Sequence, residues 1–231
     1  MTKDINHLKS DVPVITIDGP SGSGKGTIAR KVASILHWNI LDSGALYRVI
    51  AYSSKLMELN VKNELAIKEL IPSLDIKFVV TKDGQQKVYL NQQNISSQIR
   101  AENCGKQASY IAKYISIREE LKNLQRSYLR MPGLVADGRD MGTIVFPTSK
   151  LKIFLTATDE ERALRRYKQL KGKDINVSLP AVLRDINIRD KRDRERKNAP
   201  LVAANDAHII DSTKMTIREV TTRIMHLHEK L

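Results

Sequence analysis

The sequence has one cysteine, few aromatic residues and no long hydrophobic run, and these shortages exclude several classes of protein. Cys104 alone can form neither an intrachain disulfide nor a multi-cysteine zinc site, and the five histidines form no convincing ligand cluster. No stretch of about 18 apolar residues is available to span a membrane. The opening MTKDINHLKSDVP lacks the apolar region of a secretory signal. We therefore expect a protein of the reducing cytoplasm that does not enter membranes.

What the sequence has in excess is positive charge. Lysine and arginine number 39 against 26 aspartate and glutamate, which gives a formal charge of +13. This balance favours polyanionic partners such as nucleic acids, acidic membranes or phosphorylated small molecules, although a solvated basic surface is the plain alternative. Hydrophobic residues make up 41% of the 231 residues, so the chain can also bury a sizeable core.

Short apolar runs alternate with helical periodicity along most of the chain. Buried strands are expected at Val12–Asp18, Trp38–Asp42, Leu134–Asp137, Leu151–Ala157 and Ala207–Asp211. Helices are expected where Ile28, Val32, Ile35 and Leu36 recur, and at Ala45–Leu59, Cys104–Arg130, Asp159–Leu170 and Thr216–Leu231. The alternation predicts an α/β fold, a three-layer sandwich around a mainly parallel sheet that binds its ligands beyond the carboxyl ends of the strands.

Two segments depart from this alternation. Strands expected at Asp75–Val80 and Lys87–Asn91, joined by a turn at Lys82-Asp83-Gly84, predict a small antiparallel β-subdomain inserted at about 71–103. Residues 171–200 are highly charged and poor in large apolar residues, which suits a mobile lid. We predict one domain over 1–231, with a core at about 12–70, 104–170 and 201–231.

A glycine-rich loop follows the first strand. Its sequence, Gly19-Pro20-Ser21-Gly22-Ser23-Gly24-Lys25, fits the P-loop pattern G-x-x-x-x-G-K, and Gly26 then precedes Thr27. The glycines let successive N–H groups point at phosphate oxygens, and the next helix adds the positive end of its dipole. Lys25 can bridge the β- and γ-phosphates, and Thr27 can bind Mg²⁺ directly or through water. The loop predicts nucleotide binding.

The P-loop alone leaves kinases, switch GTPases and nucleic-acid ATPases open. A switch GTPase would also carry an N-K-x-D motif, which the sequence lacks, and a motor ATPase usually needs a longer chain. What distinguishes a small-molecule kinase is a second anion site at the same edge of the sheet.

Two further motifs follow expected strands and therefore fall at that edge. After Asp42-Ser43-Gly44 comes Arg48, which could clamp an acceptor phosphate bidentately; the alternative is a helix cap at Ser43 and a surface arginine. Asp137-Gly138-Arg139-Asp140 ends another buried strand, and two carboxylates around an arginine are hard to explain by packing. Together the motifs predict an acceptor site.

Four segments, in this order and spacing, resemble bacterial cytidylate kinases: ITIDGPSGSGKGT, LDSGALYR, ADGRDMGTIVFP and RDKRDRERKNAPL. The resemblance covers nearly the whole chain from Val12 onward, and the second and third segments are specific to this family. It implies a P-loop core, a lobe that binds the nucleoside monophosphate and contains an extra β-subdomain, and a mobile lid.

The resemblance also implies roles for individual residues. Ser43 would lie by the acceptor nucleotide, and Arg48 and Arg139 would hold its phosphate. Asp140, Arg118 and Ser109 would contact the cytosine ring, Asp193 and Arg189 the sugar, and Arg196 the phosphate. This chemistry suits cytosine, because a carboxylate matches its amino group, whereas uracil would set a carbonyl against that carboxylate.

Arginines alternate with acidic residues in the charged segment, at Arg184, Arg189, Arg192, Arg194 and Arg196. Such a pattern is often only a solvated helix face. Phosphoryl transfer, however, spreads charge over the equatorial oxygens, and several guanidiniums must close over it. Arg162, Arg165 and Arg166, on the preceding helix, are candidates to extend this lid.

The resulting hypothesis is transfer of the γ-phosphoryl group of ATP to CMP or dCMP, with Mg²⁺, by a monomer. Lys25, Arg139, Arg189 and Arg196 would be the catalytic residues. A kinase for UMP or shikimate is one alternative. Another is a basic nucleic-acid-binding protein with a P-loop switch, which the low aromatic content disfavours. We expect small nucleotides as partners, and neither nucleic acid nor membrane.

Overall fold

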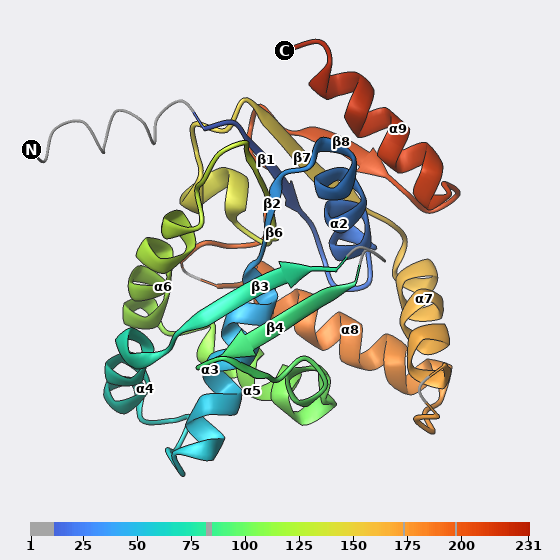
Figure 1. Ribbon diagram of the computed structural model, residues 1–231. Coiled ribbons are helices and arrows are strands. Elements are labelled where there is room, and N and C mark those ends of the chain that lie inside the picture. The colour runs from blue at the N-terminus through green and yellow to red at the C-terminus, as the bar shows by residue number, and fades with distance from the viewer. Residues whose placement is uncertain (1–11, 82–84, 173, 197) are drawn as a thin grey trace, which may run out of the picture. The chain divides into compact units, whose positions relative to one another are not determined.

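A computed structural model of the protein describes residues 12–81, 85–172, 174–196 and 198–231 (Figure 1). The chain divides into two compact units. The first unit comprises Met1–Pro13 and Ala33–Ala136, and the second unit comprises Val14–Val32 and Asp137–Leu231. The predicted turn at Lys82-Asp83-Gly84 lies outside the described residues.

The strands form two sheets, as the alternation predicts. The larger sheet has five strands in the order β2-β6-β1-β7-β8, and the smaller has three in the order β3-β4-β5. In the second unit β7 pairs in parallel with β1 on one side and β8 on the other. The larger sheet is formed by β1 (Val14–Asp18), β2 (Asn39–Asp42), β6 (Leu134–Gly138), β7 (Leu151–Thr156) and β8 (His208–Asp211). The α/β fold class is confirmed.

The second unit contains the first strand, the glycine loop and the C-terminal helices. Ile15 and Ile17 are fully buried in β1, and Thr16 between them is buried as well, so both faces of this strand are covered. The helices of this unit are α7 (Asp159–Lys171), α8 (Leu179–Arg194) and α9 (Ile217–His228), and α2 (Lys25–Leu36) also starts in it. A π-helical turn, η3 (Met141–Val145), follows β6. Ile35, one of the apolar residues whose spacing predicts this helix, is 45% exposed.

The charged segment has more apolar anchorage than its composition predicts. Within it lies α8, capped by Ser178, which puts Val182 and Ile186 into a core cluster with Ala163 and Leu170 of α7. The interpretation of residues 171–200 as poor in apolar anchors was therefore wrong for the first half of α8. Two branched residues one turn apart are enough to attach a helix, although they hardly change the mean hydropathy of the segment.

The first unit holds the antiparallel sheet and the remaining helices. Its elements are α3 (Ser43–Leu56), α4 (Glu64–Leu70), the 3₁₀ turns η1 (Ile71–Ser73) and η2 (Gln98–Arg100), β3 (Ile76–Val80), β4 (Gln86–Leu90), β5 (Gln93–Asn94), α5 (Glu102–Ile111) and α6 (Ile115–Ser127). The antiparallel pairing of β3 with β4 confirms the predicted hairpin, and β5 adds a short third strand.

The single helix predicted at Cys104–Arg130 is wrong, because the structure has two helices there. The backbone is extended at Tyr114, between α5 and α6. The Arg118 guanidinium donates to the Ala112 carbonyl over 3.1 Å and so satisfies one acceptor at the end of α5. Neither glycine nor proline marks this break, and periodicity alone could not reveal it.

Trp38 and Gly133 form a close packing contact next to β2. A Cβ on Gly133 would lie 2.3 Å from the indole ring of Trp38, so only glycine fits there. The Asn39 side-chain amide donates to the nearby carbonyls of Arg130, Met131 and Gly133 at 3.0 to 3.2 Å. These contacts fix the chain just before β6.

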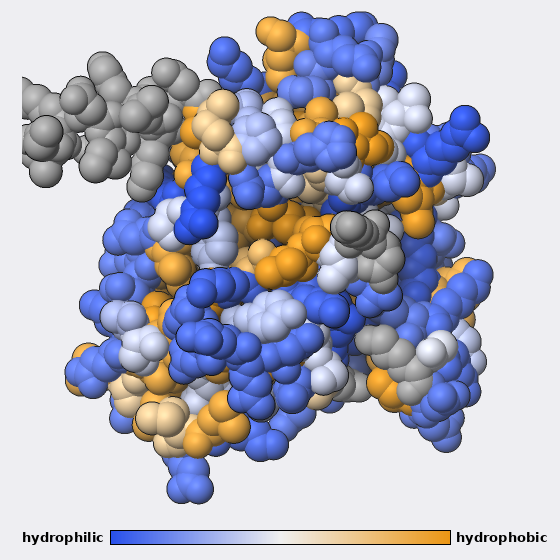
Figure 2. Space-filling model, viewed as in Figure 1, coloured by the Kyte–Doolittle hydropathy of each residue, from blue (hydrophilic) through white to orange (hydrophobic). Residues whose placement is uncertain are grey.

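Most residues on the face seen in Figure 2 are hydrophilic, as a charge of +13 and 28% charged residues lead one to expect. Within the described part of the chain, no helix has the length and the apolar character that crossing a membrane requires.

Candidate functional site

The glycine loop requires glycine for steric reasons. Gly19, Gly22 and Gly24 have φ angles of +154°, +78° and +89°, which side-chain-bearing residues rarely adopt. A Cβ on Gly19 would lie 2.0 Å from the Leu155 carbonyl oxygen, and one on Gly22 would lie 2.9 Å from the Arg162 carbonyl oxygen. Because α2 begins at Lys25, strand, loop and helix follow one another as predicted, and the helix N-terminus lies beside the loop.

A buried ion pair holds the loop at Ser21. The Arg162 guanidinium, 1% exposed, donates to the Ser21 carbonyl at 2.7 Å and forms an ion pair with Asp190 of α8. The other oxygen of Asp190 accepts the Ser21 N–H at 3.2 Å. Arg162 also donates to the Ala157 carbonyl and to Asp159. Both main-chain polar groups of Ser21 are therefore fixed by side chains of α7 and α8.

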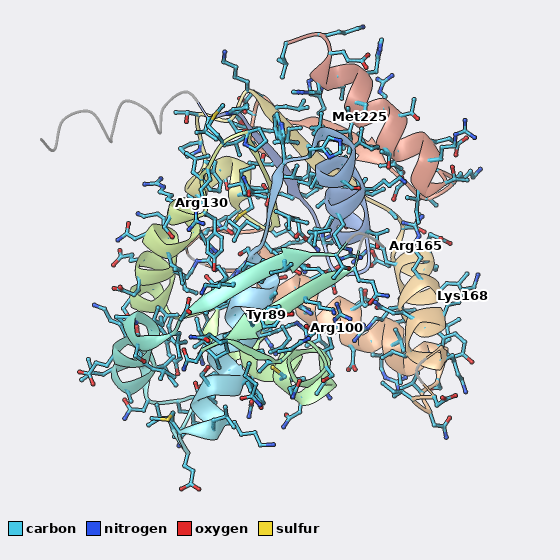
Figure 3. The ribbon with its side chains drawn as sticks, in the orientation of Figure 1. Tyr89, Arg100, Arg130, Arg165, Lys168 and Met225 are labelled. Carbon is cyan, nitrogen blue, oxygen red and sulfur yellow. The ribbon has the colours of Figure 1, made fainter. Side chains whose placement is uncertain are left out.

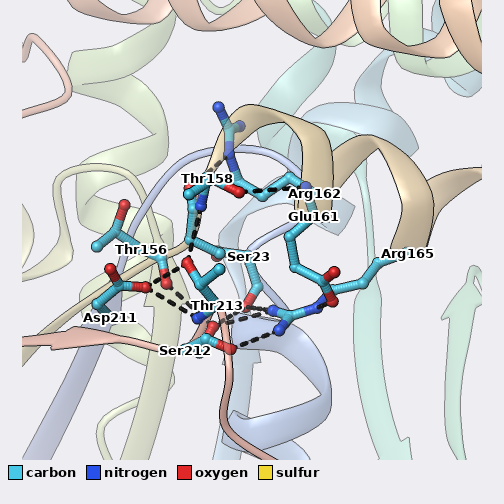
Figure 4. A network of polar contacts seen from close by, with 10 residues as sticks. Ser23, Thr156, Thr158, Glu161, Arg162, Arg165, Asp211, Ser212 and Thr213 are labelled. Atoms are coloured by element: carbon cyan, nitrogen blue, oxygen red, sulfur yellow. Dashed lines mark hydrogen bonds and ion pairs between the residues drawn. The ribbon is translucent and has the colours of Figure 1, made fainter.

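A second arginine of α7 holds the loop at Ser23. Arg165 donates to the Ser23 carbonyl at 3.3 Å, and to the hydroxyl and carbonyl of Ser212 at 2.9 and 2.6 Å (Figure 4). Glu161, one turn earlier, accepts from its Nε at 2.8 Å. Arg165 and Lys168 project from the same helix in Figure 3. Arg162 and Arg165, candidates to extend the lid, both bind the backbone of the loop in this structure, and their role in a lid stays a prediction.

The end of β6 and the end of α8 bring four predicted site residues together. Arg139 Nε lies 2.9 Å from one oxygen of Asp193, and Arg196 Nη2 lies 3.7 Å from the other. Burial raises the pKa of Asp193, but the charges of Arg139, Arg196 and Arg189 outweigh it and leave that pKa below its usual value. Asp193 is therefore ionised at neutral pH and orients guanidiniums that come from two distant parts of the sequence.

The remaining predicted residues of this unit lie in the loop or after β6. Lys25 Nζ donates to the Pro20 carbonyl at 3.3 Å, and the Thr27 hydroxyl accepts from Arg30 at 3.2 Å. Asp140 is buried at the start of η3. Sequence reasoning missed Asp18, a buried carboxylate that accepts from the backbone of this turn; its place in a buried strand beside the P-loop was the available signal.

In the first unit, the predicted residues lie on α3, α5 and α6. Ser43 is buried at the start of α3, and its hydroxyl accepts from Gln125 at 2.9 Å. Arg48 donates to the Ile99 carbonyl at 3.0 Å, and Arg118 lies 5.9 Å from the centre of the Tyr47 ring. Ser109 is buried on α5. Gln125 was not predicted, because a lone glutamine on an amphipathic helix gives no signal of its own.

The residues around the start of α2 suit a magnesium ion. Magnesium prefers hard oxygen ligands and often takes only one or two from the protein. Besides the Thr27 hydroxyl, one carboxylate oxygen of Asp137 lies 3.6 Å from the position of a Cβ on Gly26. Among the residues described, no group of three or more His, Cys, Asp or Glu side chains could hold a metal by itself.

Comparisons with known proteins agree with these observations. A family model described as "Cytidylate kinase" matches residues 15–230. The chain is 52% identical over 219 residues to a cytidylate kinase of Pseudomonas fluorescens, covering 94% of this chain and 96% of that protein. It is 50% identical over 213 residues to one of Pectobacterium atrosepticum, covering 92% and 94%.

A solved structure shares the fold. It is a protein of Eubacterium ventriosum described as uncharacterized, with a TM-score of 0.50 and 13% identity over 95% of this chain and 99% of that one. At that identity the likeness concerns the fold alone. The family model and the identity of about half over nearly the full length go further, and by them this chain belongs to the cytidylate kinase family.

Proposed function

We propose that the protein is a cytidylate kinase, which transfers the γ-phosphoryl group of ATP to CMP or dCMP. The observation that carries this proposal is the identity of about half, over 94% of the chain, to a protein named as a cytidylate kinase. The site supports it, because the second unit joins a phosphate-binding loop to a cluster of arginines around Asp193.

The donor nucleotide binds through the loop. Backbone N–H groups between Gly19 and Gly24, with the N-terminus of α2, bind the phosphates, and Lys25 adds a positive charge toward the β- and γ-phosphates. Mg²⁺, when bound, would neutralise phosphate charge, and the Thr27 hydroxyl and the Asp137 carboxylate are the groups that would hold it. Arg162 and Asp190 hold the loop backbone at Ser21.

The acceptor is bound by residues that recognise phosphate, sugar and base. Arg48 and Arg139 hold the acceptor phosphate, and Arg196 adds to them; Asp193 and Arg189 contact the sugar. Asp140, Arg118 and Ser109 contact cytosine.

Two side chains of this site are oriented by protein partners. Ser43 orients the nucleotide, and the hydrogen bond from Gln125 fixes the Ser43 hydroxyl. A guanidinium held at Nε, as that of Arg139 is by Asp193, keeps a defined plane for bidentate phosphate binding.

The acceptor phosphate is already an oxyanion near neutral pH, so its oxygen attacks the γ-phosphorus without a general base. The protein contributes alignment and positive charge, and the arginines stabilise the charge that spreads over the transferred group. We place the enzyme in the cytoplasm, as a monomer that acts on small nucleotides.

An ADP-release assay with CMP, dCMP, UMP, AMP, GMP and shikimate tests the proposal. CMP and dCMP should give the highest kcat/KM, and failure of CMP to turn over would refute it. Arg139→Met should raise the KM for CMP about tenfold or more, which is the cost of one charge-assisted hydrogen bond. The KM for ATP should change far less. Arg218→Met, an exposed residue of α9, is the matched control and should change neither.

A further inference from the structure

Asp18 is a carboxylate buried at the end of β1, with only 5% of the residue exposed. Its two oxygens each accept one backbone N–H, from Met141 at 2.9 Å and from Gly142 at 2.8 Å. These are the first two donors of η3, which a helical turn leaves without an internal partner. An ionisable group is costly to bury, so its place here calls for an explanation beyond packing.

The turn that Asp18 holds has an uncommon geometry. The Phe146 N–H donates to the Met141 carbonyl, five residues back, at 2.7 Å, and π-helical turns of this kind occur often at functional sites. The turn is also packed closely. A Cβ on Gly142 would lie 2.9 Å from the Thr16 hydroxyl oxygen, and one on Gly138 would lie 2.8 Å from the Met141 side chain. The backbone has little room to settle elsewhere.

Arg139 and Asp140 immediately precede this turn. Asp140 is its cap, with φ −147° and ψ 23°, and its carbonyl accepts the N–H groups of Ile144 and Val145 at 2.9 and 3.2 Å. The direction of both side chains therefore depends on the backbone that Asp18 fixes. We propose that Asp18 is a positioning residue of the acceptor site, which sets the place of Arg139 and Asp140 through the main chain of η3. This rests on the proposed function.

The ionisation of Asp18 gives the proposal a measurable signature. Burial raises the pKa of Asp18 to about 7, although the two backbone hydrogen bonds act to lower it. Of the nearby charges, Asp140 raises this pKa further and Arg139 lowers it. Protonation turns one acceptor oxygen into a donor that faces an N–H group, so one of the two bonds is lost. Lys152 of β7, another cation near the turn, donates from its ammonium group to the Pro147 carbonyl and to Asp206.

The kinetic test uses Asp18→Asn, whose amide can accept from only one of the two N–H groups. The KM for CMP should rise about ten- to a hundredfold, because the substitution removes a hydrogen bond to a charged group. The KM for ATP should rise less than about threefold. In the wild type the KM for CMP should also rise as the pH falls from 8 to 6, with a component near pH 7 that the variant lacks. The phosphate of CMP itself titrates near pH 6, but this affects the KM of the wild type and of the variant equally.

Gly142→Ala is the second variant, because its added methyl group would clash with the Thr16 hydroxyl and displace the same turn while Asp18 is unchanged. It should give the same split between the two KM values. Equal increases of both KM values in the variants, or an unchanged pH profile in Asp18→Asn, would overturn the positioning role.

A measurement on the wild type covers the case in which neither variant folds. The Asp18 carboxyl carbon and the amide signals of Met141 and Gly142 should titrate together near pH 7 in NMR spectra. Amide signals that do not follow the carboxyl would overturn the inference. A wild type that is inactive on CMP would refute the proposed function, but the titration would still test whether Asp18 fixes the backbone of η3.

Discussion

Two arginine–aspartate pairs of the second unit use the same chemistry for different purposes. In the first pair, the side chains of Arg162 and Asp190 are 1% and 4% exposed, and both also bind the main chain of Ser21. In the second, those of Arg139 and Asp193 are 15% and 9% exposed, and Arg139 also donates to the neighbouring Gly138 carbonyl. The first pair holds the loop backbone, whereas the second is the more exposed of the two, which suits the phosphate-binding role proposed for Arg139.

Removing the buried cation of the first pair, Arg162, should have the largest effect on stability. Arg162→Met leaves the Asp190 carboxylate buried without its partner, and we expect a loss of about 3–5 kcal/mol in the free energy of unfolding, measured by urea denaturation. Activity should fall with stability, because the loop loses its contact at Ser21. A variant as stable as the wild type would show that the pair does not anchor the fold.

The same substitution in the other pair should separate binding from stability. Arg139→Met should cost at most about 1.5 kcal/mol of unfolding free energy, because Asp193 keeps Arg196 and Arg189 as neighbours. Its larger effect should be on the KM for CMP. If urea denaturation gave equal losses for Arg139→Met and Arg162→Met, the division between anchoring and binding pairs would be wrong.

The carboxylates offer a sharper contrast through pH. The lowered pKa of Asp193 means that it stabilises the fold above its unfolded-state value near 3.8, and that this contribution disappears as the pH falls further. Asp193→Asn should therefore show a weaker loss of stability in acid than the wild type. The measurement is the unfolding free energy of both proteins from about pH 5 downward through pH 3.8, as far into acid as both remain folded.

Asp18 should show the opposite sign. Its native pKa of about 7 lies above the unfolded value of 3.8, so its contribution is greatest below pH 3.8 and declines as the pH rises to 7. The wild type should lose stability relative to Asp18→Asn between pH 5 and pH 8, followed by urea denaturation. A difference between the two proteins that is constant over this range would contradict the raised pKa.

An exposed ion pair should have the smallest effect. The side chains of Lys77 and Asp75 are 63% and 50% exposed and 3.1 Å apart. Solvent screens such a pair, so Lys77→Met should change the unfolding free energy by less than about 1 kcal/mol. A larger loss would mean that exposure is a poor guide to the weight of ion pairs in this chain.

The parts predicted from sequence are those set by local pattern. Alternation and the glycine loop gave the strand, loop and helix from Val14 to Leu36, and the hairpin of β3 and β4. The break at Tyr114 was missed, because neither glycine nor proline marks it and the contact of Arg118 with the end of α5 cannot be read from periodicity. The contact of Arg162 with the loop was not predicted, because its partner Ser21 lies 141 residues away in sequence. Contacts at such separations leave no trace in periodicity.

Trp38 is the only tryptophan in the sequence, and its indole ring packs against Gly133 beside β2. The tryptophan fluorescence of the protein is therefore the signal of one indole at one position, with no second tryptophan to subtract. A change in its intensity or wavelength reports on the junction between β2 and the segment before β6, in unmodified enzyme and without an added dye.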